Sequence, residues 1–233
     1  MAEYWIPRDV HMCITDGMCV WFNVRRDRFG GTNASTCRLG QLVEGWPTTV
    51  GTLESEQPSR ALAEDLLGRG LLTRDKRRGR AAAPPSLKAA HQQLIADVSP
   101  VRPRIRWQHI WRFISAVAMT FIALKVVSLR YALRAAEDRK RRAAGRGKPS
   151  NLNETRELVA VFLRLSLFLT HKDRCLPYSL TLFRFLSYFG IFPFLIIGVA
   201  VNPFRAHCWI QDGEFVFNCD VDIAKSFSAI LVI

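Results

Sequence analysis

The chain has 233 residues, of which 49% are hydrophobic and 23% are charged, and its formal net charge is +13. This composition supports a packed core and excludes a wholly disordered chain, and the length suits two domains. The positive charge favours an anionic partner such as nucleic acid, a membrane surface or an acidic peptide. Much of this positive charge lies in two basic runs, 74–80 and 134–148, which are typical of solvated linkers.

The cysteines are the next constraint on the class of protein. None of them forms a Cys-x-x-Cys pair, so no structural zinc site is predicted. Residues 1–16 carry charges and no long apolar core, so no secretory signal is expected. A reducing cytoplasm is therefore the simplest setting. The six cysteines are Cys13, Cys19, Cys37, Cys175, Cys208 and Cys219.

Two apolar stretches are candidates for membrane spans. The stretch 113–129 is at the short limit for a span and contains Lys125, whereas 176–201 is interrupted by Arg184 and Pro193. Both are interpreted as buried or interfacial segments. The prediction is therefore no membrane span, with peripheral membrane association left open.

Residues 1–73 predict a small module of strands and helices. Short β-rich runs are expected at 4–6, 10–15 and 19–24, and Asp16-Gly17 between the last two is a strong hairpin signal. A third strand is expected to end at Gly30-Gly31. Helical spacing follows at 34–44 and again at 59–67.

Residues 74–99 predict a linker, because basic residues are followed by Ala81-Ala82-Ala83-Pro84-Pro85, a composition that extends rather than packs. The region 100–144 and the segment 153–169 predict helices, and the apolar stripe of each is expected to face the core. The stripe of the first helix comprises Trp107, Ile110, Trp111, Ile114, Val117, Ala118 and Phe121.

Cys175 begins the stretch most suggestive of chemistry. Pro177 is typical of the first turn of a helix, which places the cysteine at the positive end of the helix dipole, with Arg174 beside it. Both features favour the nucleophilic thiolate. A buried structural cysteine is the alternative interpretation.

His207 follows an apolar β-rich run at 194–201 and opens a predicted hairpin at 207–217. A thiol upstream and a carboxylate downstream make this histidine a candidate general base. A cysteine, a histidine and an oxygen that orients the imidazole are the parts of a thiol hydrolase or transferase.

These residues resemble a known family. Cys175-Leu176-Pro177, the run 195–199, and the Ala-His-Cys-Trp at 206–209 are similar to the transglutaminase-like cysteine peptidases of lasso peptide biosynthesis, the B proteins. The resemblance is specific over 158–233. More weakly, 1–73 resembles the PqqD-like peptide recognition element fused to some members, above all at 20–29.

The resemblance implies an α+β chain. A winged-helix-like, PqqD-like module at 1–73 would be followed by a linker at 74–99, and a helical segment and a transglutaminase- or papain-like peptidase domain would occupy 100–233. The front module would bind the leader of a precursor peptide, and the rear domain would cleave it in the bacterial cytoplasm. A partner cyclase similar to asparagine synthetase would then use ATP to close the macrolactam. No cofactor motif occurs in this chain.

The resemblance also assigns roles to residues. Cys175 would be the nucleophile and His207 the base. The family aspartate directly follows an asparagine, but here Cys219 follows Asn218 and the acid comes one residue later, at Asp220. Because a one-residue slip turns a side chain to the opposite face of a strand, three alternatives stay open: a re-aimed Asp220, Asn218 as orienting residue, or an impaired enzyme.

Leader contacts are assigned by analogy of fold to Arg28 and Phe29 on a strand and to Leu62 and Leu66 on a helix. The leading hypothesis is a leader peptidase, and the first alternative is a catalytically impaired escort for the cyclase. Nucleic-acid binding is not expected, because the basic runs contain no interleaved aromatic residues.

Overall fold

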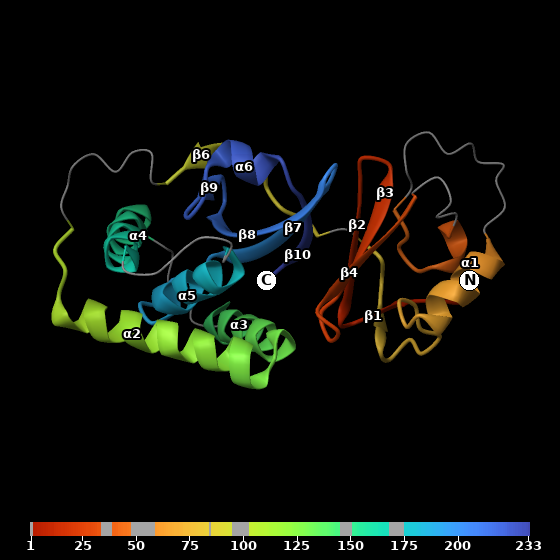
Figure 1. Cartoon of the computed structure of the whole chain (residues 1–233), viewed down its shortest axis with the longest axis horizontal. Helices are drawn as coiled ribbons and strands as arrows, with labels where there is room; N and C mark the ends of the chain where they lie inside the picture. The colour runs from red at the N-terminus through yellow and green to blue at the C-terminus, as the bar shows by residue number, and fades with distance from the viewer. Residues whose placement is uncertain are drawn as a thin grey trace. The chain divides into compact units, whose positions relative to one another are not determined.

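The computed structural model describes residues 2–33, 39–47, 59–83, 85–94, 103–144, 151–167 and 175–233. The chain contains both helices and antiparallel strands, as predicted for an α+β protein (Figure 1). It divides into two compact units. One comprises 1–86 with 199–205 and 228–231, and the other comprises 87–198 with 206–227 and 232–233.

The first unit contains a three-stranded antiparallel sheet in the order β2-β3-β4. Its strands are β2 (Val10–Thr15), β3 (Met18–Asn23) and β4 (Arg28–Asn33). Asp16 and Gly17 both have positive φ, 45° and 72°, as expected for a tight hairpin turn, so the predicted hairpin is confirmed. β4 continues through Gly30-Gly31 instead of ending there. A Cβ on Gly31 would lie 3.2 Å from Met18 Cε, so glycine lets β4 run close to the Met18 side chain of β3.

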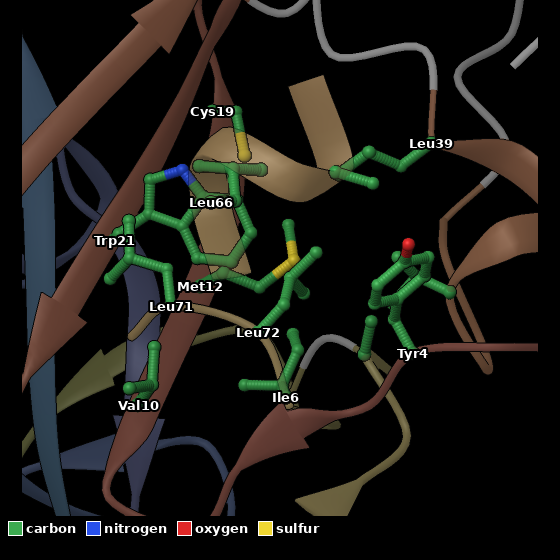
Figure 2. Close-up of a cluster of buried hydrophobic side chains, with 13 residues drawn as sticks. Tyr4, Ile6, Val10, Met12, Cys19, Trp21, Leu39, Leu66, Leu71 and Leu72 are labelled. Atoms are coloured by element: carbon green, nitrogen blue, oxygen red, sulfur yellow. The ribbon is translucent and has the colours of Figure 1, made fainter. Parts of the chain in front are cut away.

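Helix α1 (Arg60–Gly68) closes the core of this unit (Figure 2). Ser59 caps it by accepting a hydrogen bond from Leu62 N at 3.3 Å. Ala63 and Leu66 are fully buried on its inner side. Of the helix expected at 34–44, residues 34–38 lie outside the described residues, and Gly40–Leu42 form a short 3-10 helix, η2. The buried cluster comprises Tyr4, Ile6, Val10, Met12, Cys19, Trp21, Leu39, Val43, Ala63, Leu66, Leu71, Leu72 and Ala82.

The predicted linker at 74–99 is wrong over much of its described length. β5 (Gly79–Arg80) pairs with β1 (Ile6–Pro7), and Ala82 is buried in the cluster of the first unit. Gly79 permits this pairing, because a Cβ there would overlap the side chain of Trp5. Further along, β6 (Gln92–Gln93) pairs in parallel with β9 (Phe215–Val216). Backbone pairing with distant strands holds these segments, and amino-acid composition does not indicate such pairing.

The second unit contains four long helices, and aromatic side chains lie between three of them, α2, α4 and α5. The helices are α2 (Trp107–Ile122), α3 (Leu129–Ala144), α4 (Leu152–Ser166) and α5 (Cys175–Ser187). A five-residue π-helix, η3 (Ala123–Val127), continues α2. Phe113 of α2 lies edge-on to Phe162 of α4 at 5.5 Å and to Phe185 of α5 at 6.5 Å. The predicted helices are confirmed as elements.

The predicted inward face of the first of these helices is wrong. Trp107, Trp111 and Phe121 are 69%, 57% and 61% exposed, while the buried side chains of α2 are His109, Phe113, Ala116 and Thr120. The two sets follow the same helical spacing on opposite sides of α2. Packing on α4 and α5 selects the less apolar of the two stripes.

A five-stranded sheet in the order β10-β7-β8-β9-β6 completes the fold. β7 (Phe194–Val201) coincides with the predicted apolar run, and β8 (Phe204–Asp212) begins three residues before the predicted hairpin. Gly213, with φ of 55°, turns the chain into β9. The short helix α6 (Val221–Lys225) then leads to β10 (Ser228–Val232).

Candidate active site

Cys175 is the first residue of α5, as expected, and its side chain is half-buried. The following turns are buried, which anchors the helix while its first residue stays within reach of solvent. The N-terminus of a helix carries free N–H groups and partial positive charge, which stabilise a thiolate. Arg174, the predicted neighbouring cation, lies outside the described residues.

Ser179 shows which way this end of α5 faces. It lies four residues after Cys175, on the same side of the helix. Its buried hydroxyl donates to the carbonyl oxygen of Cys208 on β8 at 2.8 Å and accepts from Asn218 Nδ2 at 2.8 Å. The side of α5 that carries Cys175 is therefore turned toward β8 at Cys208.

Electrostatics place two further thiols near Cys175. Burial raises the pKa of Cys208 far above its ordinary value, and the charge of Cys175 adds to this. Burial likewise raises the pKa of Cys219 to about 12, with added contributions from Asp220 and Cys175. Both thiols are therefore protonated at neutral pH. No metal-holding group of three His, Cys, Asp or Glu side chains occurs among the residues the structure describes.

His207 lies on the other face of β8. Consecutive side chains of a strand point in opposite directions, so His207 faces away from the side on which Cys208 lies near Cys175. Its ring lies 6.0 Å from that of Trp209, nearly parallel to it, and 5.3 Å from that of Phe227, which follows α6. In Figure 1, α5 is drawn below β8 and α6 above it.

Burial also determines the protonation of His207. The surrounding apolar rings lower the pKa of its imidazole, which favours the neutral form. Nε2 is buried and has no hydrogen-bond partner among the described residues. The lowered pKa makes this imidazole harder to protonate than a solvent-exposed histidine.

Gly198 of β7 makes room for this aromatic arrangement. A Cβ at that position would lie 2.7 Å from Trp209 Cζ3 and 2.9 Å from Phe227 Cβ, closer than side chains approach one another. The glycine within an otherwise apolar strand therefore lets the indole ring cross β7. Any side chain here would displace Trp209 and, with it, His207.

Neither expected orienting residue is joined to His207 by a hydrogen bond that the structure records. Asp220 is exposed and caps α6, its Oδ1 accepting from Asp222 N at 2.8 Å. The amide of Asn218 is engaged elsewhere: Oδ1 accepts from Ile210 N at 2.7 Å, and Nδ2 donates to Ser179. Within the described residues Cys175 lies near Cys208 and Cys219, and Asn218 reaches the same side of α5 through Ser179. No recorded hydrogen bond in the described part of the chain joins His207 to this group.

The residues expected to contact a leader peptide have mixed positions. Arg28 and Phe29 lie on β4, which has β3 as its strand partner within the described part of the chain, and Phe29 stacks on Phe22 at 4.3 Å. Leu62 is partly buried against the core. Leu66 is fully buried, so it is a core residue and offers no surface to a peptide.

Two structural residues of the site were missed in the sequence. Ser179 joins α5 to β8, and its spacing from Cys175 within an apolar helix was the available signal. Gln211 is buried on β8, where it accepts from Trp209 Nε1 at 3.1 Å and donates to the carbonyl oxygens of Lys88 and Gly213. Alternation places Gln211 on the face of His207 and Trp209, where it fixes the indole ring.

Comparison with known families is consistent with this arrangement. Residues 117–232 match a family model described as the Transglutaminase-like superfamily. No curated protein and no solved structure matches the chain. The matched region begins within α2 and ends within β10, so it includes Cys175, His207 and Asp220.

Proposed function

Because residues 117–232 form a transglutaminase-like domain, we propose that the chain is a cysteine peptidase that removes the leader from a lasso precursor peptide in the bacterial cytoplasm. The observation that carries the proposal is the position of Cys175, half-buried at the start of a helix within that domain whose later turns are buried. A nucleophilic thiol needs both the positive helix end and access for substrate. Burial raises the pKa values of Cys13, Cys208 and Cys219 and so holds these three thiols protonated.

In the proposed reaction the Cys175 thiolate attacks the carbonyl carbon of the last leader residue. The tetrahedral intermediate collapses as the C–N bond breaks, and protonated His207 donates its proton to the departing amine of the core peptide. The leader is left as a thioester on Cys175. His207 then takes a proton from water, whose oxygen attacks the thioester and releases the leader and the thiolate.

The mechanism requires His207 to reach the Cys175 side of β8. A buried nitrogen without a partner costs about 1–3 kcal/mol, so a local change that gives Nε2 a partner would be favourable. β8 begins with three exposed residues, 204–206, directly before His207. A change of strand direction there would re-aim the imidazole while Ser179 and Asn218 hold the later part of β8 in place.

The first unit would bind the leader as a PqqD-like element. An extended peptide can add to the edge of β4 by backbone hydrogen bonds, with Arg28 beside it and with α1, which carries Leu62, as the neighbouring helix. The released core peptide would pass to an asparagine-synthetase-like cyclase, which would supply the ATP-dependent step. Phe29 stacks on Phe22, which fixes its ring at this edge.

The direct test is cleavage of a precursor peptide, followed by mass spectrometry, with Cys175→Ala against Cys219→Ala as a matched thiol control. Cys175→Ala should lower the rate by roughly 1,000-fold or more because the nucleophile is lost. It should leave binding of a fluorescent leader unchanged, since α5 belongs to the other unit. Cleavage by Cys175→Ala at the parent rate would refute the proposal.

A second candidate function is a non-catalytic escort that delivers the precursor to the cyclase. The observation that favours it is the position of Asp220, which caps α6 while Cys219 occupies the place of the family aspartate. Alkylation at neutral pH separates the two functions: a peptidase predicts that Cys175 reacts before Cys208 and Cys219. An unreactive Cys175, together with gain of cleavage in Cys219→Asp, would favour the escort.

A further inference from the structure

Helix α2 and its continuation η3 expose a large apolar surface. Together they form one helix, Trp107–Val127, of 21 residues, which is long and apolar enough to cross a membrane, yet only 22% of its most apolar window is buried. Many of its large aromatic and branched side chains are exposed. The members of this outer face are Trp107 (69%), Trp111 (57%), Ile114 (50%), Phe121 (61%), Ile122 (45%) and Val126 (74%).

The outer face is continuous because its residues recur every three or four positions along the helix. Trp107 and Trp111 lie edge-to-face at one end, with ring centroids 5.8 Å apart. Lys125 falls on the same stripe at the other end and is also exposed. An apolar stripe with tryptophans at one end and a cation at the other is typical of a helix at a membrane–water interface.

The charge around this helix identifies the kind of surface it would meet. Between residues 98 and 136 the sequence contains seven Lys or Arg and no Asp or Glu. A protein partner would ordinarily be met with charges of both signs, whereas a sequence stretch with only basic charges on either side of an apolar stripe suits anionic lipid headgroups. The basic residues are Arg102, Arg104, Arg106, Arg112, Lys125, Arg130 and Arg134.

The opposite side of α2 decides between crossing a membrane and lying on it. Phe113 packs on Phe162 and Phe185, and His109 lies 5.5 Å from the ring of Phe189. The carbon of the Arg112 guanidinium lies 4.2 Å from the centre of the Phe189 ring. A helix that crossed a bilayer would lose these contacts and would carry Arg112 and Lys125 into the hydrocarbon.

We propose that α2 and η3 lie in the plane of an anionic membrane surface, with the outer face inserted at the boundary of headgroups and acyl chains. The inner face stays packed on α4 and α5, so the domain binds as a folded body. Attraction between the basic residues of this stretch and anionic headgroups adds to burial of the outer face. This proposal is independent of the peptidase activity.

Vesicle flotation of the full chain tests it, with phosphatidylcholine vesicles that contain or lack phosphatidylglycerol. The parent should float with the anionic vesicles and not with the neutral ones, and added salt should release it. The affinity of the double variant Trp111→Glu, Phe121→Glu for anionic vesicles should be lower by about tenfold or more, since two apolar side chains that would insert into the membrane are lost. Ile223→Glu, at an exposed apolar residue of α6, is the matched control and should float like the parent.

Three outcomes would overturn the proposal: equal flotation of the double variant and the parent, a parent that ignores anionic vesicles, or resistance of the bound parent to salt and carbonate. A parent that elutes as a dimer, ignores vesicles and is made monomeric by the double variant would assign the face to a second copy. Circular dichroism of both variants should match that of the parent, because all three positions are exposed.

Discussion

The two faces of strand β8 carry different chemistry. On the face toward α5, the carbonyl oxygen of Cys208 accepts a hydrogen bond from Ser179, and Cys175 lies near. Asn218 bonds to Ser179 and to Ile210 N, so three hydrogen bonds of 2.7 to 2.8 Å hold this part of β8. On the other face, His207 lies among the rings of Trp209 and Phe227, and its Nε2 lacks a partner among the described residues. Hydrogen bonds therefore hold the first face in place, whereas the second face carries a candidate base, His207, that has no hydrogen-bond partner for Nε2 among the described residues.

The difference teaches that a cysteine and a histidine in suitable sequence order do not by themselves make a catalytic pair. Strand alternation decides which of two neighbours meets the thiol, and here Cys208 occupies the position beside α5. If His207 is the base, a change at the start of β8 must precede catalysis. Substitutions on one face of β8 should leave the other face intact.

The largest effect is expected for His207→Asn on the ring-lined face. Removal of the general base should lower the cleavage rate by roughly 100- to 10,000-fold, whereas leader binding should not change. Cleavage kinetics and leader anisotropy measure the two properties. Trp209→Phe, which keeps an aromatic ring on the same face, is the matched control, and a similar loss in both variants would reduce His207 to a packing residue.

Asp220 is the next site, and Asp220→Asn is the informative substitution. Asparagine caps a helix about as well as aspartate, so α6 should persist while the carboxylate is removed. If Asp220 orients His207, the cleavage rate should fall about tenfold or more with little change in thermal stability, and Cys219→Ala should lower it far less. The reverse ranking of Asp220→Asn and Cys219→Ala would exclude Asp220 from the mechanism.

On the face of β8 toward α5, Ser179→Ala should act through stability. The substitution leaves Asn218 Nδ2 without its acceptor and frees the Cys208 carbonyl, so the free energy of unfolding should fall by about 1–3 kcal/mol. Urea denaturation measures this change. Ser115→Ala, at an exposed serine of α2, is the control and should stay within about 0.5 kcal/mol of the parent. A neutral Ser179→Ala would mean that α5 is not fixed to β8 by this hydroxyl.

His11 of the first unit lies outside the site, and the prediction there concerns stability and not cleavage. Burial and, secondarily, the charge of Arg80 lower its pKa from 6.5 to about 3. Arg80 Nη2, which can only donate, lies 3.0 Å from His11 Nδ1, so the folded imidazole is neutral. Below pH 6.5 the His11 imidazole binds a proton in the unfolded chain but not in the folded chain. The free energy of unfolding should therefore decline as the pH falls toward 3.

His11→Gln, which keeps an acceptor for Arg80, should flatten part of that decline. Urea titrations of parent and variant across this range measure the difference. Other buried histidines contribute to both proteins equally, so only the difference between the two curves reports on His11. Superimposable curves would show that His11 takes up its proton in the folded state as readily as in the unfolded one.

Local signals predicted much of this fold. Asp16-Gly17 fixed a hairpin, Ser59 marked a helix start, and the apolar run at 194–201 became β7, because each depends on the chain within a few residues. The pairing of Gly79–Arg80 with β1 and of Gln92–Gln93 with β9 depends on distant partners, and composition suggested a linker instead.

The exposed stripe of α2 and the outward His207 escaped prediction for a related reason. Periodicity identifies a stripe or an alternating face, but it does not say which neighbour that face will meet. In α2 the stripe that contains Phe113 packs against the core. In β8 the side that carries Cys208 packs against α5. The helix start at Cys175 was local and was predicted correctly.

The most direct test of the account is to trap the acyl-enzyme. The parent chain is mixed with precursor peptide, quenched in acid within the first turnover and digested, and the cysteine peptides are weighed. The account predicts the mass of the leader as a thioester on Cys175, and none on Cys208 or Cys219. Rapid cleavage without a Cys175 adduct, or an adduct on another thiol, would contradict it.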